Sequence, residues 1–193
     1  AAVEAIDALT PLEGTVVVTY GDVPLLEAAT LRELVAVHNV DSNAVTVLTA
    51  RVEDPAGYGR VLRAEDGTVT GIVEQKDATA EQLAVNEINS GIYAFDAAVL
   101  RSALSQVSTD NAQGEMYLTD VLALARAAGG RVAAVETSDQ WQVEGANDRV
   151  QLAALNEDQV ENTWSALVPM IENGVLNEVL KVNEDTVKHP SKN

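Results

Sequence analysis

The stretch that decides the fold is Thr15-Val-Val-Val-Thr-Tyr-Gly-Asp-Val-Pro24, a β-branched run that passes directly into turn residues. Val and Thr favour extended backbone, and a short continuous run of this kind is typical of a strand buried on both faces. Gly21 and Pro24 end the run because both residues favour turns. The sequence therefore predicts a buried parallel strand that leads into a loop.

A helix and a second strand follow this first strand. Between residues 27 and 39 the apolar side chains recur mostly at helical spacing, and residues 44–50 form another buried β-type run, Ala-Val-Thr-Val-Leu-Thr-Ala. Strand, helix and strand together make one right-handed crossover unit. This order predicts an α/β fold with a doubly wound sheet.

A β-hairpin comes next in the chain. Two alternating runs, at residues 58–63 and 68–74, flank an Asp66-Gly67 turn, which is a strong hairpin signal. A hairpin inserted in an α/β sheet often carries residues that face a substrate. The patterns beyond it predict a strand at 87–95, helices at 97–107 and 117–128, a strand at 131–136 and a helix at 147–156.

Composition limits the classes of function. The chain has 193 residues, 47% of them hydrophobic, which fits one domain with a real core. Its net charge of −18 argues against a nucleic-acid partner, and the absence of cysteine excludes disulfides and thiolate metal sites. No apolar run reaches the roughly 20 residues of a membrane span. We therefore expect no membrane partner and a cytoplasmic location.

Asp22 is the first candidate for chemistry. It stands where the first strand ends, and ligands of open α/β sheets collect outside the carboxyl ends of strands. A carboxylate there can hold Mg²⁺, which takes few protein oxygens when it also binds phosphates. Asp is equally a common turn residue beside Gly and Pro, and on these residues alone the turn is slightly favoured.

A second group of candidates lies on the hairpin and on the strand after it. Glu74 and Asn89 place a carboxylate and an amide on neighbouring strands, which suits the hydroxyl and amide groups of a sugar. Gly59 could let a ligand approach the backbone, and Arg60 could hold a carboxylate. The alternatives are an exposed ion pair between Lys76 and its acidic neighbours, and a simple bend into the hairpin.

The remaining candidate residues stand at two predicted helix starts or are histidines. Thr119 and Asn147 stand at helix starts, where amides suit an anion and the Asn147 carbonyl oxygen suits a metal. N-terminal capping explains the same two residues without any site. His38 and His189 are the only histidines, and ordinary surface placement explains them better than a metal site or an acid–base pair.

Six motifs succeed one another in the order and spacing of one enzyme family. The motifs are Tyr-Gly-Asp-Val-Pro-Leu (20–25), Gly-Tyr-Gly-Arg (57–60), Ile-Val-Glu-Gln-Lys-Asp-Ala (72–78), Glu-Ile-Asn-Ser-Gly-Ile-Tyr (87–93), Glu-Met-Tyr-Leu-Thr-Asp (115–120) and Glu-Gly-Ala-Asn-Asp-Arg-Val-Gln-Leu (144–152). In these motifs the chain resembles, over about residues 1–157, the uridylyltransferase domain of the bifunctional N-acetylglucosamine-1-phosphate uridylyltransferase and glucosamine-1-phosphate acetyltransferase, particularly the actinobacterial forms.

The resemblance implies a nucleotide-diphospho-sugar transferase fold, a Rossmann-like sheet with an inserted β-hairpin. It implies that UTP and N-acetylglucosamine 1-phosphate give pyrophosphate and UDP-N-acetylglucosamine, a precursor for peptidoglycan, without a protein nucleophile or base. Asp22 and Asn147 would hold Mg²⁺, and Tyr20 and Gly21 would lie near the nucleotide-sugar. The N-acetylglucosamine pocket would be lined by Gly59, Glu74, Asn89, Tyr117 and Thr119.

Two departures from the family qualify these expectations. The family's first strand and its Gly-rich phosphate loop are not in the sequence, so residues 1–157 would be a partial uridylyltransferase domain with impaired activity. A sheet edge or an apolar face would then be uncovered. Residues 158–193 form an atypical segment that could be a helix followed by a loose tail. A trimer is expected only if the parent protein has the family's β-helix domain. The alternative function is an inactive module or scaffold that binds a sugar phosphate or nucleotide-sugar.

Overall fold

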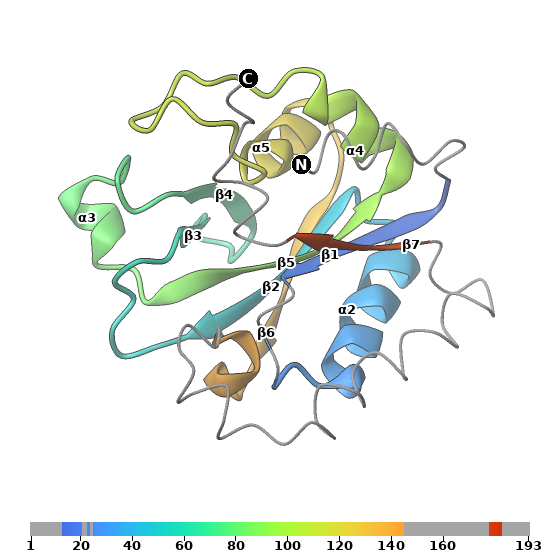
Figure 1. Cartoon of the computed structure of the whole chain (residues 1–193), viewed down its shortest axis with the longest axis horizontal. Coiled ribbons are helices and arrows are strands. Elements are labelled where there is room, and N and C mark those ends of the chain that lie inside the picture. Colours follow the sequence, from blue (N-terminus) through green and yellow to red (C-terminus); the bar gives the residue numbers. More distant parts are fainter. Residues whose placement is uncertain (1–12, 21–22, 24, 145–177, 183–193) are drawn as a thin grey trace, which may run out of the picture.

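The computed structural model describes residues 13–20, 23, 25–144 and the backbone of 178–182, and its seven strands form one mixed sheet (Figure 1). None of the helices in this described part is long and apolar enough to cross a membrane. In chain order the elements are β1 (Thr15–Tyr20), α2 (Ala28–Val40), β2 (Val45–Arg51), β3 (Arg60–Arg63), β4 (Val69–Val73), α3 (Ala80–Leu83), β5 (Glu87–Asp96), α4 (Ala97–Leu104), α5 (Asp120–Ala127), β6 (Val132–Thr137), a 3₁₀ turn (Gln140–Val143) and β7 (Glu178–Val182).

The sheet is organised around the long strand β5. One edge of β5 pairs with β2, which in turn pairs with β6. The other edge is shared: β1 pairs with residues 93–96, and β3 pairs at Ile88. Because β2 occupies the first edge at both ends of β5, β1 and β3 follow one another along the second edge, and residues 89–92 lie between them. This interval is where the candidate site is found.

The environment of β1 differs from the sequence prediction in its pairing. The strand is buried as predicted, but its β5 neighbour is antiparallel, and β5 also separates β1 from β2. The other edge of β1 pairs in parallel with β7, so the edge expected to be uncovered has a partner among the described residues. Local sequence patterns reveal a strand but not its neighbours, which explains the difference.

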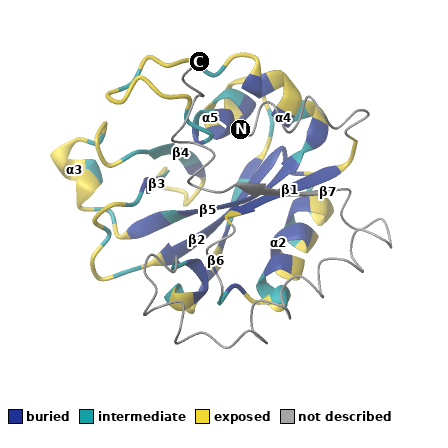
Figure 2. Ribbon diagram, in the orientation of Figure 1, coloured by how far each residue is buried: buried dark blue, intermediate teal, exposed yellow. Residues whose placement is uncertain are grey.

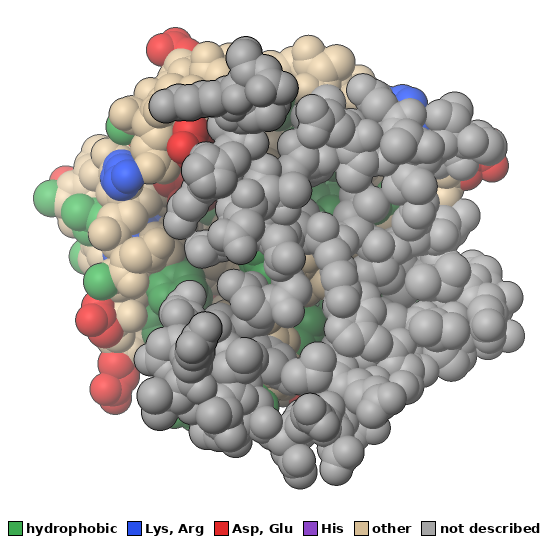
Figure 3. Space-filling view, in the orientation of Figure 1, with side chains coloured by type: hydrophobic (Ala, Val, Ile, Leu, Met, Phe, Trp, Pro, Cys, Tyr) green, Lys and Arg blue, Asp and Glu red, His purple; other side chains and the backbone are tan. Residues whose placement is uncertain are grey.

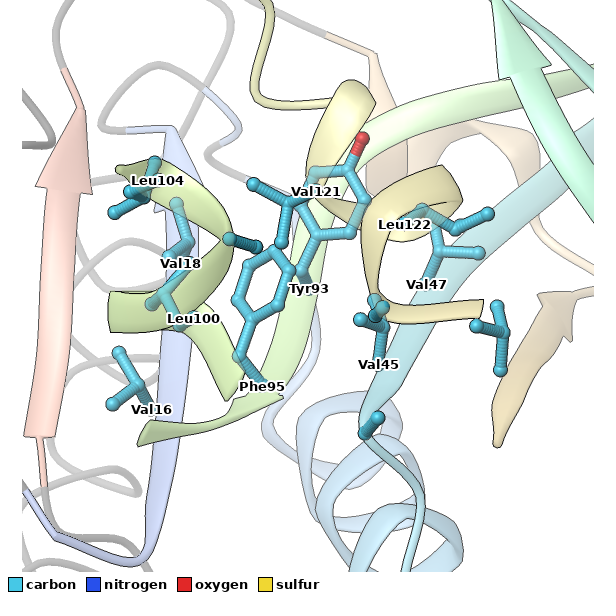
Figure 4. Close-up of a cluster of buried hydrophobic side chains, with 14 of the residues drawn as sticks. Val16, Val18, Val45, Val47, Tyr93, Phe95, Leu100, Leu104, Val121 and Leu122 are labelled. Carbon is cyan, nitrogen blue, oxygen red and sulfur yellow. The ribbon is translucent and has the colours of Figure 1, made fainter. Parts of the chain in front are cut away.

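Each face of the sheet carries its own hydrophobic core. Helices α4 and α5 cover one face and α2 covers the other (Figure 1), and Figure 2 shows buried residues along both sides of the strands. Val16 and Val18 belong to the α4–α5 core, whereas Val17 belongs to the α2 core, as the two-residue period of a strand requires. In the first core the rings of Tyr93 and Phe95 stack with centroids 5.2 Å apart (Figure 4).

His38 is buried, so the predicted surface placement is wrong. Its exposed fraction is 3%, and its Nδ1 lies 3.1 Å from the Thr46 hydroxyl oxygen. Burial lowers the pKa of His38, and the Asp96 carboxylate partly opposes this effect. The helix spacing of Leu31, Leu34 and His38 already puts the histidine on the apolar stripe of α2.

Candidate functional site

An irregularity in the middle of β5 frames the site. The β2–β5 register shifts between Val47 and Thr49, so β5 carries extra residues there. Ser90 compensates for the interrupted ladder: its hydroxyl donates to the Leu48 carbonyl (2.6 Å) and accepts from the Ile92 N–H (3.1 Å). The bulge therefore leaves backbone groups satisfied while it re-aims the neighbouring side chains.

Asn89 is held in one orientation by this bulge. Its Oδ1 accepts a hydrogen bond from the Gly91 N–H (3.0 Å) and another from the Tyr93 hydroxyl (2.8 Å). That hydroxyl projects from the apolar core (Figure 4). Because both partners are donors, Oδ1 is the inward atom and the Nδ2 group is the outward one. No described residue accepts from Nδ2, so Asn89 offers two donors to a ligand.

Glu74 lies beside Gly59 at the start of the hairpin. A β-carbon added to Gly59 would stand 3.2 Å and 3.3 Å from the two Glu74 carboxylate oxygens. The Gly59 carbonyl accepts from the Asn89 N–H (2.9 Å), which ties the hairpin to β5. The structure thus brings together three of the residues singled out from the sequence, because Gly59 lies next to the Glu74 carboxylate and accepts from the Asn89 N–H.

The surroundings of Glu74 are short of positive charge. Burial raises its pKa, the nearby Asp77 and Asp120 carboxylates raise it further, and the Thr119 side chain partly offsets the shift. Lys76 does not form the ion pair considered from the sequence: its ammonium donates to the Gln113 side chain. The negative charge of Glu74 is therefore poorly neutralised by its surroundings, and a ligand that donates hydrogen bonds to the carboxylate would stabilise it.

Thr119 and Tyr117 border the same carboxylate. Thr119 is the N-cap residue of α5, but its side chain makes no capping hydrogen bond, so capping does not explain it. Its backbone is already helical, whereas a capping side chain normally accompanies extended backbone. The side chain interacts with Glu74 instead. Tyr117 also lies near Glu74, and its hydroxyl oxygen accepts from Gln113 Nε2 (2.9 Å).

Tyr20 closes the interval between β1 and β3. A β-carbon on Gly91 would fall 1.8 Å from Tyr20 Cε2, so the ring rests directly on the glycine. Gly91 also has a φ of +77°, which disfavours a side chain. The group that approaches the backbone at this glycine is the Tyr20 ring. Tyr20 itself stays 36% exposed.

Replacing Gly91 by alanine should cost more stability than the same change at Gly67. Both glycines have positive φ, +77° and +84°, but nothing lies within 4 Å of a β-carbon at Gly67. Both variants lose stability through backbone strain. Only Gly91→Ala also displaces the Tyr20 ring, and this should increase its loss in free energy of unfolding by about 1 to 2 kcal/mol. Urea unfolding measures the difference. Equal losses, or an extra loss that persists in a Tyr20→Ala background, would contradict the packing of ring on glycine.

Some candidates remain outside this arrangement. Gly21, Asp22 and Asn147 lie outside the described residues, so their placement rests on the sequence alone. Within the described ranges no group of three or more His, Asp and Glu could hold a metal ion. Arg60, suggested above as a partner for a carboxylate, is buried, and its Nη1 donates to the Tyr58 carbonyl; among the described residues it forms no ion pair.

Ser90 and Tyr93 belong to the framework of the site but were not singled out from the sequence. Their signal was present in the run Asn-Ser-Gly at residues 89–91, because these residues are depleted in strand interiors and a strand glycine often marks a bulge. The tyrosine four residues after Asn89 carries no periodic signal of its role, since the bond spans the bulge.

Known proteins resemble this chain closely in sequence. "Bifunctional protein GlmU" of Pseudarthrobacter chlorophenolicus is 68% identical over 165 residues, which are 86% of this chain and 34% of that protein. The protein of the same name from Paenarthrobacter aurescens is 64% identical over 175 residues, 89% of this chain and 35% of its own length. The chain spans about a third of the length of these curated relatives.

The fold is shared with more distant nucleotide-sugar enzymes. A Bacillus anthracis structure described as a glucose-1-phosphate thymidylyltransferase matches with a TM-score of 0.58 at 21% identity, over 83% of this chain and 59% of that one. The predicted nucleotide-diphospho-sugar transferase fold with an inserted hairpin is thereby confirmed. The family model described as nucleotidyl transferase matches residues 1–159. The chain therefore belongs to the nucleotidyl transferase family.

Proposed function

We propose that this chain is the uridylyltransferase part of a protein like its curated relatives. It would transfer a uridylyl group from UTP to N-acetylglucosamine 1-phosphate, giving UDP-N-acetylglucosamine and pyrophosphate. The high identity to those relatives and the family match support this assignment. The cytoplasmic location expected from the sequence belongs to the same proposal.

The placement of Glu74 and Asn89 next to the same residue, Gly59, is the observation that carries the sugar-binding half of the proposal. Each sugar hydroxyl both donates and accepts, so it is best matched by a fixed acceptor beside a fixed donor. Glu74 supplies the acceptor, and Asn89 supplies the donor because its Oδ1 is already engaged by Gly91 and Tyr93. Gly59 leaves the room that a larger residue would fill. Tyr117 and Thr119 border this pocket in the proposal.

The transfer itself requires alignment and charge neutralisation. An oxygen of the sugar phosphate attacks the α-phosphorus of UTP. The bond between the α-phosphorus and the oxygen that bridges it to the β-phosphorus breaks, and pyrophosphate leaves. A chain with a net charge of −18 needs a cation to accommodate this charge. Asp22 and Asn147 offer a carboxylate and an amide oxygen, the donor types that suit Mg²⁺. Bound there, Mg²⁺ would neutralise phosphate charge. Tyr20 and Gly21 would lie beside the nucleotide-sugar.

Changing Asn89 to aspartate tests the sugar site with a minimal alteration. The variant keeps an oxygen for the Gly91 and Tyr93 donors but replaces the outward Nδ2 donor by an acceptor close to Glu74. We expect UDP-N-acetylglucosamine to bind about tenfold more weakly in titration calorimetry with Mg²⁺ present. Asn86→Asp is the matched control, because Asn86 is exposed and binds only Arg51 through its side chain. Equal affinities of all three proteins would refute the pocket.

Turnover separates the transferase from an inactive binding module. The parent chain is incubated with UTP, Mg²⁺ and N-acetylglucosamine 1-phosphate, and pyrophosphate is measured. Its release supports the transferase. Binding of UDP-N-acetylglucosamine without pyrophosphate release would favour the module, and absence of both would refute the proposed function.

A further inference from the structure

Three arginines converge on a pocket at the far end of the hairpin. The cavity has a volume of about 390 Å³ and lies between the β3–β4 turn, the end of α5 and the start of β6. Arg63 comes from β3, Arg126 from the last turn of α5 and Arg131 from the residue before β6. Its size is within the range of pockets that bind small molecules.

Such a cluster is unexpected in this chain. Acidic residues outnumber Lys and Arg by 30 to 12, yet three of the twelve basic side chains line this one cavity. Among the described residues that Figure 3 draws in colour, basic side chains are few and scattered. None of the residues that line the cavity is acidic, so an anionic ligand would meet only positive charge in its wall.

Arg63 is the fixed member of the cluster. Its Nε and Nη2 donate to the Glu87 carboxylate (2.7 Å and 2.6 Å), and its Nη1 donates to the Gly67 carbonyl (2.8 Å). These three bonds use three of its five N–H groups. The guanidinium is therefore held against the hairpin turn with donors to spare.

The other two arginines are not tightly committed. Arg131 forms an ion pair with Asp41 at 3.3 Å, but the two side chains are 61% and 38% exposed, and such surface pairs are weak. Within the described residues Arg126 makes no ion pair. The Asp66 carboxylate accepts a hydrogen bond from the Thr68 N–H (2.9 Å), and its pKa is lowered mainly by Thr68 and only lastly by the charge of Arg126. An anion could recruit both guanidiniums at little cost.

We propose that this pocket is a second ligand site that binds a small phosphorylated anion, with Arg63, Arg126 and Arg131 as its cationic partners. Several phosphate oxygens on one small ligand can accept from three guanidinium forks arranged around a cavity of this size. The edge backbone of β6 adds further polar groups to the lining, since β6 pairs only with β2 in the described sheet.

The pocket is distinct from the proposed sugar site. Gly59 and Glu74 flank the outer ends of β3 and β4, whereas Arg63 and Val69 stand at the turn ends of the same strands. Three residue steps along β3, from Arg60 to Arg63, span about 10 Å. Occupation of the arginine pocket and of the sugar site can therefore be measured separately, and the second site does not depend on the proposed reaction.

The test is an NMR titration of the ¹⁵N-labelled chain with inorganic pyrophosphate in metal-free, low-salt buffer. We expect saturable shifts of the amide signals of Gly67–Val69 and Val132–Ala134. The double variant Arg126→Gln/Arg131→Gln should weaken this binding at least tenfold. It spares Arg63, which anchors the hairpin. The control Arg32→Gln removes an exposed positive charge from α2 and should leave the affinity within twofold of the parent.

Three results would overturn the site. One is equal affinity of the double variant and the Arg32→Gln control. Another is a set of shifts confined to Gly59 and Asn89, which would place pyrophosphate in the proposed nucleotide-sugar site and leave the proposed function standing. The third is tighter binding of citrate than of pyrophosphate at the same amides, which would assign the pocket to carboxylates rather than phosphates.

Discussion

Replacing Glu87 by alanine should lower the free energy of unfolding by about 2 to 4 kcal/mol. Glu87 is 2% exposed and accepts two hydrogen bonds from Arg63 and a longer one from Arg51 (3.3 Å). Removing the carboxylate leaves the Arg63 guanidinium, only 29% exposed, without its counter-charge. The change also detaches the end of β3 from β5, so the hairpin loses its main polar anchor.

The control for this prediction is Glu136→Ala. Glu136 also pairs with Arg51, at 3.2 Å, but both side chains are more than 40% exposed, so the loss should stay within about 0.5 kcal/mol. Urea unfolding at pH 7 compares the two variants. A loss at Glu87 no larger than that at Glu136 would show that the buried pair does not hold the hairpin.

The ion pair of Glu87 with Arg63 should also make the stability of the fold depend on pH. Burial by itself would raise the pKa of Glu87, but hydrogen bonds from Arg63 and the charges of Arg63 and Arg51 hold it below its usual value of 4.5. A carboxylate with a lowered pKa contributes stability above its unfolded pKa and loses it as the pH falls through the folded one. The difference between parent and Glu87→Ala should therefore shrink below about pH 4.5.

Local patterns were sufficient to predict most elements of the fold. The β-branched run at residues 15–20 is β1, the helical spacing at 27–39 is α2, and the Asp66-Gly67 turn joins β3 to β4. Each of these depends on contacts between near neighbours in the sequence. The insertion of β5 between β1 and β2 and the pairing of β7 with β1 depend on long-range contacts, which no local period encodes.

The candidate site shows a similar division. Glu74, Asn89 and Gly59 were singled out from residue type and family resemblance, and the structure brings the three together. The sequence could not show which atom of Asn89 faces outward, because that depends on the Tyr93 hydroxyl and on a bulge. It also could not show that Thr119 interacts with Glu74 rather than capping its helix.

Changing Glu74 to glutamine should have opposite effects on stability and on ligand binding. Burial of the carboxylate and the charges of Asp77 and Asp120 disfavour its ionisation, as its raised pKa indicates. A neutral amide of nearly the same shape removes that cost, so the free energy of unfolding at pH 7 should rise. The affinity for UDP-N-acetylglucosamine should fall by about 10- to 100-fold, because a ligand hydroxyl loses a charged acceptor.

The pH dependence identifies ionisation as the cause. A carboxyl group whose pKa is higher in the folded state than in the unfolded state stabilises the fold when it is protonated. This contribution is complete below the unfolded pKa and is lost as the pH rises through the folded pKa. The advantage of Glu74→Gln should therefore be present at pH 7, shrink as the pH falls through the raised folded pKa, and be absent below about pH 4.5, the ordinary value for this group. An advantage of the same size at both pH values would point to packing instead.

Glu65→Gln supplies the matched control because it makes the same charge change at an exposed position of the hairpin turn. It should leave both stability and affinity close to those of the parent. If Glu74→Gln destabilised the chain at pH 7, the Glu74 carboxylate would be a structural anchor in the manner of Glu87. If Glu74→Gln instead gained stability and kept full affinity, the carboxylate would be strained without serving a ligand. Only a gain in stability with a loss of affinity fits a side chain whose unfavourable burial is maintained for binding.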